Sequence, residues 1–315
     1  MHQKTNTIIP TIGLFFLLAS VSLTSGCVSD KSLTQLTPRW ALPPSTFIEV
    51  NGMKVHVRDE GPRDDPQPLV LLHGTSASLH TWEGWVKALK DQHRVITLDM
   101  PGFGLTGPFL TDDYSMQHYV VFLNQTLKQL QVRQYSLVGN SLGGGIAWHM
   151  ALAYPDQVKK LILVDATGYM VKPKSTPIGF RIAKIPVLNK VMEFTLPRRV
   201  VESSVRAVYA DPSKVSEELV ERYYDLTLRT GNRRALVERF KQAPSGADSD
   251  AIQNIKTPTL ILWGKQDQLI PVENAARFHK DIQGSQIRIF EGLGHVPHEE
   301  DPVQTAEAAR SFLNQ

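Results

Sequence analysis

Cysteine is almost absent from this chain, and so are the motifs that hold metals and nucleotides. Cys27 is the only cysteine among 315 residues, so no disulfide can form within the chain and Cys27 needs another explanation. The sequence contains no H-E-x-x-H spacing, no glycine pattern for a dinucleotide and no phosphate-binding loop. We therefore expect neither a metal nor a cofactor.

The charge of the chain excludes one class of partner. The formal net charge is only +3, and no arginine-rich or lysine-rich tract occurs. Nucleic-acid binding is not expected, because it requires a concentrated basic surface. No internal repeat or low-complexity segment is visible. With 42% hydrophobic residues, the chain can bury a sizeable core as one large domain or two.

Strand-like and helix-like segments alternate along most of the chain. Asn51-Gly52 lies between two strand-like segments, and this pair is the strongest short signal for a β-hairpin. Strands are expected at residues 68–72, 94–98, 135–138, 161–164, 259–263 and 286–290, and those at 94–98, 161–164 and 259–263 are expected to be buried. Helices are expected at residues 80–89, 116–130 and 146–154. The alternation predicts an α/β fold with a mostly parallel sheet and helices on both faces.

Ser141 is the most informative position. It stands in the run Gly139-Asn140-Ser141-Leu142-Gly143, between a predicted strand and a predicted helix. Glycine two positions before and two after a serine, at a strand-to-helix turn, is the pattern of a nucleophile elbow. Larger side chains at the flanks would collide with the neighbouring strand or helix, and the turn strains the backbone of the serine. Such strain is useful where a hydroxyl must be presented to a substrate.

A nucleophilic serine needs a base, and the base needs an acid that fixes its tautomer. Asp267 follows the predicted strand 259–263, and His295 follows the predicted strand 286–290. Both side chains therefore belong to loops at the carboxyl ends of strands, where open α/β sheets place their active sites. We predict that Ser141, His295 and Asp267 form a catalytic triad.

Acyl transfer also requires backbone N–H groups aimed at the oxyanion of the tetrahedral intermediate. One is expected from Leu142, the residue after the nucleophile. The other is expected from Thr75, in the loop that follows the predicted strand 68–72. His73 comes too early in the chain to be the base, so we assign it a role in shaping this loop.

Five motifs give the sequence a resemblance to the α/β-hydrolase family that covers nearly everything from Thr46 to Gln315. The order of the predicted triad along the chain, Ser-Asp-His, is also the order in that family. The motifs are His73-Gly74, Asp99-Met100-Pro101-Gly102-Phe103-Gly104, Gly139-Asn140-Ser141-Leu142-Gly143-Gly144, Trp263-Gly264-Lys265-Gln266-Asp267 and Gly294-His295. The resemblance implies a serine hydrolase with an eight-stranded sheet, and it does not name the substrate.

Four other side chains are candidates for roles in or near the site. Asp165 also ends a predicted strand, and some members of the family place the acid there; we prefer Asp267 because its Gly-x-x-Asp loop matches the motif. His298 is expected at the surface or at a helix end. His149 is expected to pack as an ordinary helix residue, and Asp99 to fix the loop in which it lies.

The alternation of strands and helices stops after Gly168 and resumes at Thr259. Between them, residues 171–254 contain helix-like stretches and no buried strand. An insertion at this point resembles the helical lid that roofs the active site in the α/β-hydrolase family. The core is then expected to comprise residues 46–170 and 255–315. The insertion carries more basic than acidic residues. We explain this excess by an ordinary solvated surface in preference to contact with anionic lipid.

The first 27 residues resemble a bacterial export signal. An uncharged apolar run from Ile8 to Leu23 is shorter than the roughly 20 residues that a membrane-spanning helix needs. Small residues then precede Cys27, as in the lipobox of a bacterial lipoprotein, although Thr24 stands where that motif prefers leucine. The alternative is an ordinary signal peptide, or an uncleaved anchor, with an incidental cysteine.

The lipoprotein interpretation divides the amino-terminal segment into two parts. Residues 1–26 are expected to be the signal peptide, and residues 27–45 a tether that starts at lipid-modified Cys27. By resemblance, Val28 after the cysteine favours the outer membrane of a Gram-negative host. The expected location is therefore a membrane-anchored or secreted protein, with the membrane reached through the lipid anchor.

These features predict hydrolysis of a carboxylic ester, by an esterase or lipase, through an acyl-enzyme on Ser141. The expected partner is a small-molecule or lipid ester. The alternative is cleavage of a carbon–carbon bond in ring-cleavage products, because Asn140 and the double glycine after Ser141 occur in such hydrolases. Those enzymes are cytoplasmic and usually carry Gly-Pro-Gly where this chain has Thr75-Ser76-Ala77. A non-catalytic α/β-hydrolase binding protein is a remote alternative, since every triad position is filled.

Overall fold

The framework of the molecule is one eight-stranded sheet. The computed structural model describes residues 29–170, 172–243 and 246–315, so the predicted signal peptide and Cys27 lie outside the described residues. The strand order is β1-β2-β4-β3-β5-β6-β7-β8. The strands are β1 (Thr46–Val50), β2 (Met53–Glu60), β3 (Leu69–Leu72), β4 (Val95–Leu98), β5 (Tyr135–Asn140), β6 (Val158–Val164), β7 (Thr259–Gly264) and β8 (Gln286–Phe290).

The sheet is parallel except at one edge. β1 and β2 form the predicted hairpin, with Asn51 and Gly52 in its turn at φ values of 51° and 78°. β2 also pairs antiparallel with β4, and the remaining neighbours pair in parallel. The predicted α/β fold with a mostly parallel eight-stranded sheet is confirmed.

The α-helices fall into an amino-terminal helix, the core helices and the helices between β6 and β7. The first group is α1 (Leu33–Trp40) alone. The core helices are α2 (Glu83–Leu89), α3 (Met116–Gln129), α4 (Leu142–Ala153), α10 (Glu273–Asp281), α11 (Pro297–Glu300) and α12 (Pro302–Leu313). Those between β6 and β7 are α5 (Ile178–Lys184), α6 (Leu188–Phe194), α7 (Arg198–Arg206), α8 (Glu217–Thr227) and α9 (Asn232–Lys241).

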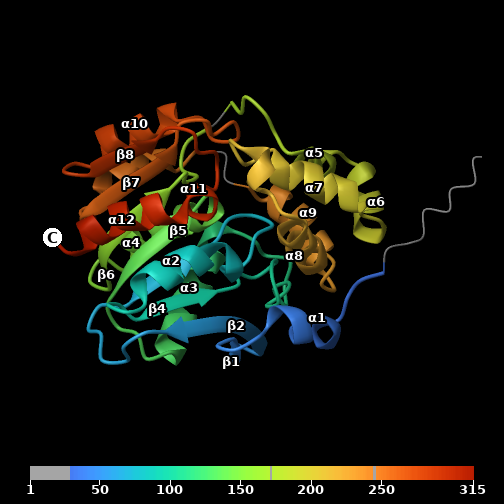
Figure 1. The fold of residues 1–315 in the computed structure, drawn as a ribbon, viewed down its shortest axis with the longest axis horizontal. Helices are drawn as coiled ribbons and strands as arrows, with labels where there is room; N and C mark the ends of the chain where they lie inside the picture. Colours follow the sequence, from blue (N-terminus) through green and yellow to red (C-terminus); the bar gives the residue numbers. More distant parts are fainter. Residues whose placement is uncertain (1–28, 171, 244–245) are drawn as a thin grey trace, which may run out of the picture.

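Successive residues of the central strands belong to opposite faces of the sheet. In β3, Leu69 and Leu71 join an apolar cluster with side chains of α2 and α12. Val70 and Leu72 join the other cluster, with side chains of α3, α4 and α10. This alternation follows from the two-residue period of a strand, and it explains why uninterrupted apolar runs predicted buried strands. Helices α2 and α12 cross one face of the sheet (Figure 1).

Helices α5 to α9 form an insertion beyond the carboxyl ends of the strands. They lie together on one side of the molecule, next to the end of the sheet that carries Ser141 (Figure 1). The segment is helical, in agreement with the sequence-based expectation, whereas its function as a lid concerns movement and stays a prediction. Within the described ranges, no helix combines the length and the apolar character needed to cross a bilayer.

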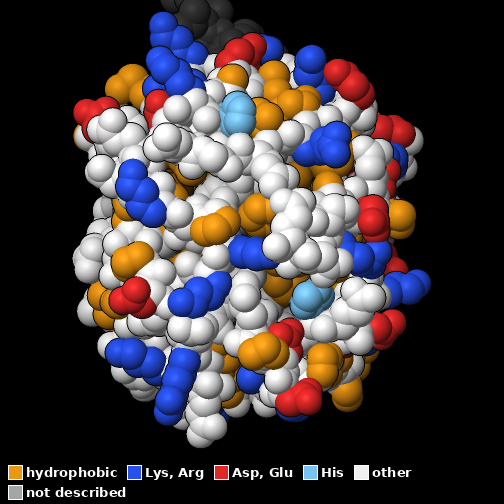
Figure 2. Space-filling model, turned by 90° about the vertical axis from the view of Figure 1, so that its left-hand side faces the viewer, with side chains coloured by type: hydrophobic (Ala, Val, Ile, Leu, Met, Phe, Trp, Pro, Cys, Tyr) orange, Lys and Arg blue, Asp and Glu red, His pale blue; other side chains and the backbone are white. Residues whose placement is uncertain are grey.

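Lysine and arginine side chains are dispersed over the surface. The face shown in Figure 2 carries them among acidic, apolar and uncharged groups. This mixture agrees with the small net charge of the chain.

The predicted tether over residues 27–45 is wrong for part of its length, because it contains helix α1. Ser32 and Gln35 form a reciprocal capping box, with Ser32 N–H donating to Gln35 Oε1 at 2.8 Å and Gln35 N–H donating to Ser32 Oγ at 3.3 Å. Trp40 is buried, and its Nε1–H donates to Asp225 of α8 at 2.9 Å. A helix of eight residues has too few turns to show an apolar period, so the sequence did not predict it.

Candidate active site

Ser141 occupies the turn between β5 and α4, with φ 53° and ψ −115°. A Cβ atom on Gly143 would lie 2.3 Å from the carbonyl oxygen of Leu72, and one on Gly139 would lie 2.1 Å from the carbonyl oxygen of Gly143. Only glycine at these two positions lets α4 approach β3 and β5 so closely. The local sequence thus produces the strained turn that presents Ser141 at the edge of the sheet.

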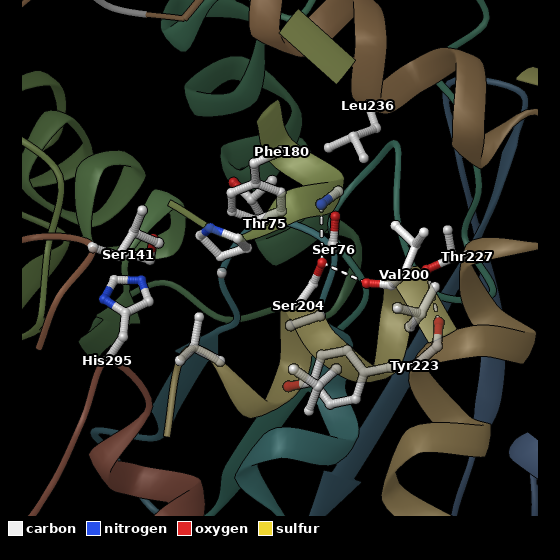
Figure 3. Close-up of a pocket in the computed structure, with 18 of the residues that line it drawn as sticks. Thr75, Ser76, Ser141, Phe180, Val200, Ser204, Tyr223, Thr227, Leu236 and His295 are labelled. Atoms are coloured by element: carbon white, nitrogen blue, oxygen red, sulfur yellow. Dashed lines mark hydrogen bonds between the residues drawn. The ribbon is translucent and has the colours of Figure 1, made fainter. Parts of the chain in front are cut away.

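His295 and Asp267 are hydrogen bonded to each other. His295 Nδ1 lies 2.7 Å from Asp267 Oδ2, and Asp267 Oδ1 accepts from the N–H groups of Leu269 (2.8 Å) and Ile270 (2.9 Å). With the carboxylate as acceptor, His295 donates through Nδ1–H, and its Nε2 is free to accept a proton. His295 and Ser141 line the same pocket (Figure 3). The three predicted triad residues are therefore gathered in one place.

Asp165 lies beside this pair without bonding to the imidazole. Polar atoms of Asp165, Asp267 and His295 lie within 4.8 Å of one another, yet Asp165 Oδ1 accepts from the N–H of Gly264 at 3.1 Å. Burial and the neighbouring Asp267 carboxylate raise the pKa of the Asp165 carboxyl well above its ordinary value. The surroundings of Asp165 therefore disfavour its charged form, and Asp267 is the acid in contact with the histidine.

Asn140 links the turn that carries Ser141 to the loop that carries His295 (the histidine loop). This role was not predicted from the sequence. Its Nδ2 donates to the carbonyl oxygens of His295 (3.0 Å) and Val164 (3.2 Å). The ends of β5 and β6 and the loop after β8 are thus held together next to Ser141. The side chain precedes the nucleophile in the motif, but only the folded structure shows what it contacts.

Glu300 links the histidine loop to the insertion. This role was also not predicted from the sequence. Its buried carboxylate accepts from the N–H of Gly294 (2.8 Å) and from those of Ala210 and the following residue (3.1 and 2.9 Å). Beside it, the N–H of His295 donates to the carbonyl oxygen of Val208 at 2.8 Å. Glu300 stands in an acidic run that predicts an exposed helix start, so the local sequence gives no sign of its burial.

The two predicted oxyanion amides lie on either side of the serine. Leu142 is the first residue of α4, so its N–H has no acceptor within the helix. For the Thr75 N–H, no acceptor occurs among the residues that the structure describes. The loop that carries Thr75 passes close to the nucleophile, because a Cβ on Gly74 would lie 3.1 Å from Ser141 Cβ.

His73 and Asp99 fix the loops around the site. His73 donates through Nδ1–H to the carbonyl oxygen of the next residue (2.7 Å), and its Nε2 accepts from the N–H of Met100 (2.9 Å). Burial lowers the pKa of His73, in keeping with a neutral ring. Asp99 accepts from the N–H groups of Leu79 (2.8 Å) and Leu105 (2.7 Å). Both residues act on loop conformation, as the sequence analysis expected.

The expectation that His298 lies at the surface or caps a helix is wrong. Its side chain is fully buried, and its ring centroid lies 4.0 Å from that of Trp82. Burial lowers the pKa of His298 to about 3, which keeps the ring neutral. Helix α11 packs against α2, so its first turn faces the core and not the solvent. The acidic residues that follow His298 concealed this burial in the sequence.

A first, apolar pocket leads from Ser141 into the insertion. It encloses about 800 Å³ of empty space, part of it open to solvent. Ser141 and His295 lie on one side, Tyr223 and Thr227 on the other, and Ser204 between them (Figure 3). The apolar side chains of its wall include Pro177, Phe180, Met192, Leu196, Val205 and Leu236.

A second pocket meets the first at Ser141. It has about 1170 Å³ of empty space, again partly open. Thr75, Ser141 and Phe180 line both pockets. The wall of the second pocket carries Lys184, Arg239, and the pair His149 Nε2 and Asp248 Oδ2, which lie 2.8 Å apart. The wall of the first pocket carries Arg233, which is paired with Asp30.

Comparison with known proteins identifies the family. Residues 67–302 match the family described as alpha/beta hydrolase fold. The match spans about three quarters of the chain and includes every residue of the site described above. This protein belongs to the α/β-hydrolase fold family.

The proteins that are similar to this chain act, according to their names, on more than one kind of substrate. A 2-hydroxy-6-oxo-2,4-heptadienoate hydrolase of Pseudomonas putida is 30% identical over 262 residues, covering 79% of this chain and 88% of the relative. The monoacylglycerol lipase ABHD6 of Homo sapiens is 29% identical over 257 residues, covering 78% of this chain and 74% of the relative. The solved structure of a meta-cleavage product hydrolase from Pseudomonas fluorescens has a TM-score of 0.74 at 26% identity, covering 85% of this chain and 97% of that one.

Proposed function

We propose that this protein hydrolyses carboxylic esters whose acyl group is apolar. Ser141 attacks the acyl carbonyl while His295 accepts its proton, and Asp267 orients His295 and stabilises the imidazolium. The backbone N–H groups of Thr75 and Leu142 hold the oxyanion. His295 then protonates the departing alcohol. Water releases the acid from the acyl-enzyme, with His295 again as the base.

The wall of the first pocket carries this proposal. Three of its hydroxyl groups, those farther from Ser141, already donate to protein acceptors: Ser204 to the carbonyl oxygen of Val200 (2.7 Å), Thr227 to that of Tyr223 (2.7 Å), and Tyr223 to the Glu299 carboxylate (2.9 Å). A ligand in this pocket therefore meets mainly hydrocarbon. Burial of an acyl chain there is favourable by roughly 0.8 kcal/mol per methylene.

A series of nitrophenyl esters tests the proposal. We expect kcat/KM to rise from the acetate to the octanoate by up to about 10³-fold, because each added methylene buries more apolar surface in the first pocket. Assays below and above substrate solubility then separate an esterase from a lipase, since a lipase gains activity at the lipid interface. Failure to hydrolyse any ester of the series would contradict the proposal.

A second candidate function is hydrolysis of a carbon–carbon bond in a vinylogous diketone. The 30% identity to the heptadienoate hydrolase of Pseudomonas putida supports it, and the same triad chemistry can serve it. The decisive assay gives the protein 2-hydroxy-6-oxo-2,4-heptadienoate and follows the loss of its visible absorbance. Turnover of this diketone, together with inactivity on every ester, would replace the first proposal by the second.

We also propose that residues 1–26 direct export and that lipid on Cys27 anchors the protein to a membrane. Helix α1 changes what such an anchor would do. The N–H of Lys31 donates to the carbonyl oxygen of Leu228 at 2.7 Å, so the packed domain begins a few residues after Cys27. A lipid on Cys27 would hold the catalytic domain close to the bilayer and not on a long tether.

Replacing Cys27 with serine tests the anchor. In a bacterial host, Cys27→Ser is expected to leave the leader uncleaved or to alter its processing, because the thiol that accepts the lipid is gone. A soluble fragment that starts at Ser29 should keep full esterase activity, since it retains α1 and the whole site. Mass spectrometry of the mature wild-type N-terminus provides the measurement. An unmodified N-terminus, or a retained segment 1–26, rules the lipid anchor out.

A further inference from the structure

Arg239 is a buried cation without a counterion. It lies on α9, and its side chain is only 5% exposed. Its Nε and Nη1 have no hydrogen-bond partner, and no carboxylate within the described ranges forms an ion pair with it. Burial lowers the pKa of Arg239, yet an arginine stays charged in proteins. The fold therefore holds a full positive charge that nothing in the described chain neutralises.

The other fully buried arginine of the described chain is treated differently. Arg233, on the same helix, is 4% exposed, and its Nη2 donates to Asp30 at 2.6 Å. Arg222, partly buried on α8, is paired with Glu299. Burial of an unpaired charge is costly, so a protein normally supplies a partner for it. The missing partner at Arg239 suggests that the counterion arrives with a ligand.

The position of Arg239 indicates which ligand that is. The side chain lines the second pocket, whose wall includes Ser141 and Thr75. Lys184 adds a second positive charge to the wall. Asp248 is the acidic residue of this wall, and it is already bonded to His149. The described wall of the second pocket thus carries two cationic side chains, and its one acidic residue is already engaged.

We propose that Arg239 binds a negatively charged oxyanion, a phosphate or a carboxylate, that the substrate carries on its alcohol side. The two pockets share Ser141, Thr75 and Phe180, so a scissile ester carbonyl at Ser141 directs its acyl chain into the apolar pocket and its alcohol into the cationic one. A guanidinium forms two parallel hydrogen bonds with either oxyanion. This inference rests on the proposed ester hydrolysis and narrows the substrate to anionic esters.

A matched pair of substrates tests the inference. 1-Lauroylglycerol and 1-lauroylglycerol 3-phosphate have the same acyl chain and the same ester bond, and they differ only in the phosphate. Arg239→Gln is expected to lower kcat/KM for the phosphate ester by about 10- to 100-fold, the usual effect of losing hydrogen bonds to a charged group. The neutral ester should change less than about threefold. Arg239→Lys should restore part of the activity on the phosphate ester, because it restores the charge without the planar fork.

Arg234 provides the control on the same helix. It is exposed and paired with Asp112, away from both pockets, so Arg234→Gln should leave the ratio of the two substrates unchanged. A loss of equal size on both substrates in Arg239→Gln, with Arg239→Lys giving no recovery of the ratio, overturns the inference. The inference is also overturned if the wild-type enzyme prefers the neutral ester and Arg239→Gln leaves that preference unchanged.

Binding measurements on the wild-type protein cover the case in which Arg239→Gln does not fold. Glycerol 3-phosphate should raise Tm and compete with nitrophenyl butyrate, whereas glycerol should do neither. A parallel series with the carboxylates butyrate and glutarate shows whether the site prefers phosphate or carboxylate. No effect of any of these anions on Tm overturns the inference, even when ester hydrolysis is intact. If esters are not substrates but the anions still raise Tm, the proposed function fails and the anion site stands.

Discussion

Replacing Ser141 with alanine should reduce kcat for ester hydrolysis by at least about 10⁴-fold. The hydroxyl is the only group that can form the acyl-enzyme in the proposed mechanism, and its removal leaves oxyanion binding without a nucleophile. The backbone strain at φ 53° is the same for serine and alanine, so the Tm of Ser141→Ala should stay within a few degrees of the wild type.

An organophosphonate provides a chemical check on the same residue. It should label the wild-type protein once, at Ser141, and leave Ser141→Ala unlabelled. Ser204 is the matched control, because it lines the same pocket but its hydroxyl donates a hydrogen bond to the carbonyl oxygen of Val200. Label found on Ser204, or full activity in Ser141→Ala, would show that the nucleophile has been misassigned.

Asp267→Asn should cost about 10⁴-fold in kcat. The carboxylate accepts from His295 Nδ1–H at 2.7 Å and so keeps the proton off Nε2, the nitrogen that must accept the proton of Ser141. An asparagine at this position can present its amide to the histidine and favour the wrong tautomer. The measurement is single-turnover acylation with a nitrophenyl ester, which isolates the step that needs the base.

Asp165→Asn is the matched control, with an expected loss below about tenfold. Burial and the Asp267 carboxylate raise the pKa of the Asp165 carboxyl well above its ordinary value, so an uncharged amide of the same shape fits the same surroundings. Its contact with the Gly264 N–H can be kept by the amide oxygen. The opposite ranking of the two variants would move the acid role to Asp165.

The strands and the predicted triad were accessible from the sequence for one physical reason. The central strands are mostly apolar runs, β8 alternates apolar and polar residues, and each predicted triad residue follows one of these strands within a few positions. In the structure these strand ends meet at one edge of the sheet, where His295 and Asp267 are in hydrogen-bond contact. Short-range patterns were therefore sufficient to locate Ser141, Asp267 and His295.

The features that could not be predicted depend on contacts between distant segments. Helix α1 is stable because Trp40 packs and bonds across to Asp225, 185 positions away. His298 is buried because α11 folds against α2, although its sequence neighbours are acidic. In the sequence, Arg239 is one of several basic residues on α9, and only the folded structure shows that it is buried. In each case the decisive partner is remote in sequence, where local periodicity carries no information.

The attachment of the insertion to the histidine loop divides this protein into parts that can and cannot be exchanged. Glu300 and the backbone of His295 hold the stretch from Val208 to Asp211 through three hydrogen bonds. Recombination with a relative can replace helices α5 to α7, which supply most of the apolar pocket, and leave that junction untouched. A crossover placed after Asp211 would replace the residues whose N–H groups donate to Glu300, Ala210 and Asp211, and would disturb the loop that carries the proposed base, His295. The natural cut for grafting a new acyl specificity is therefore before Val208.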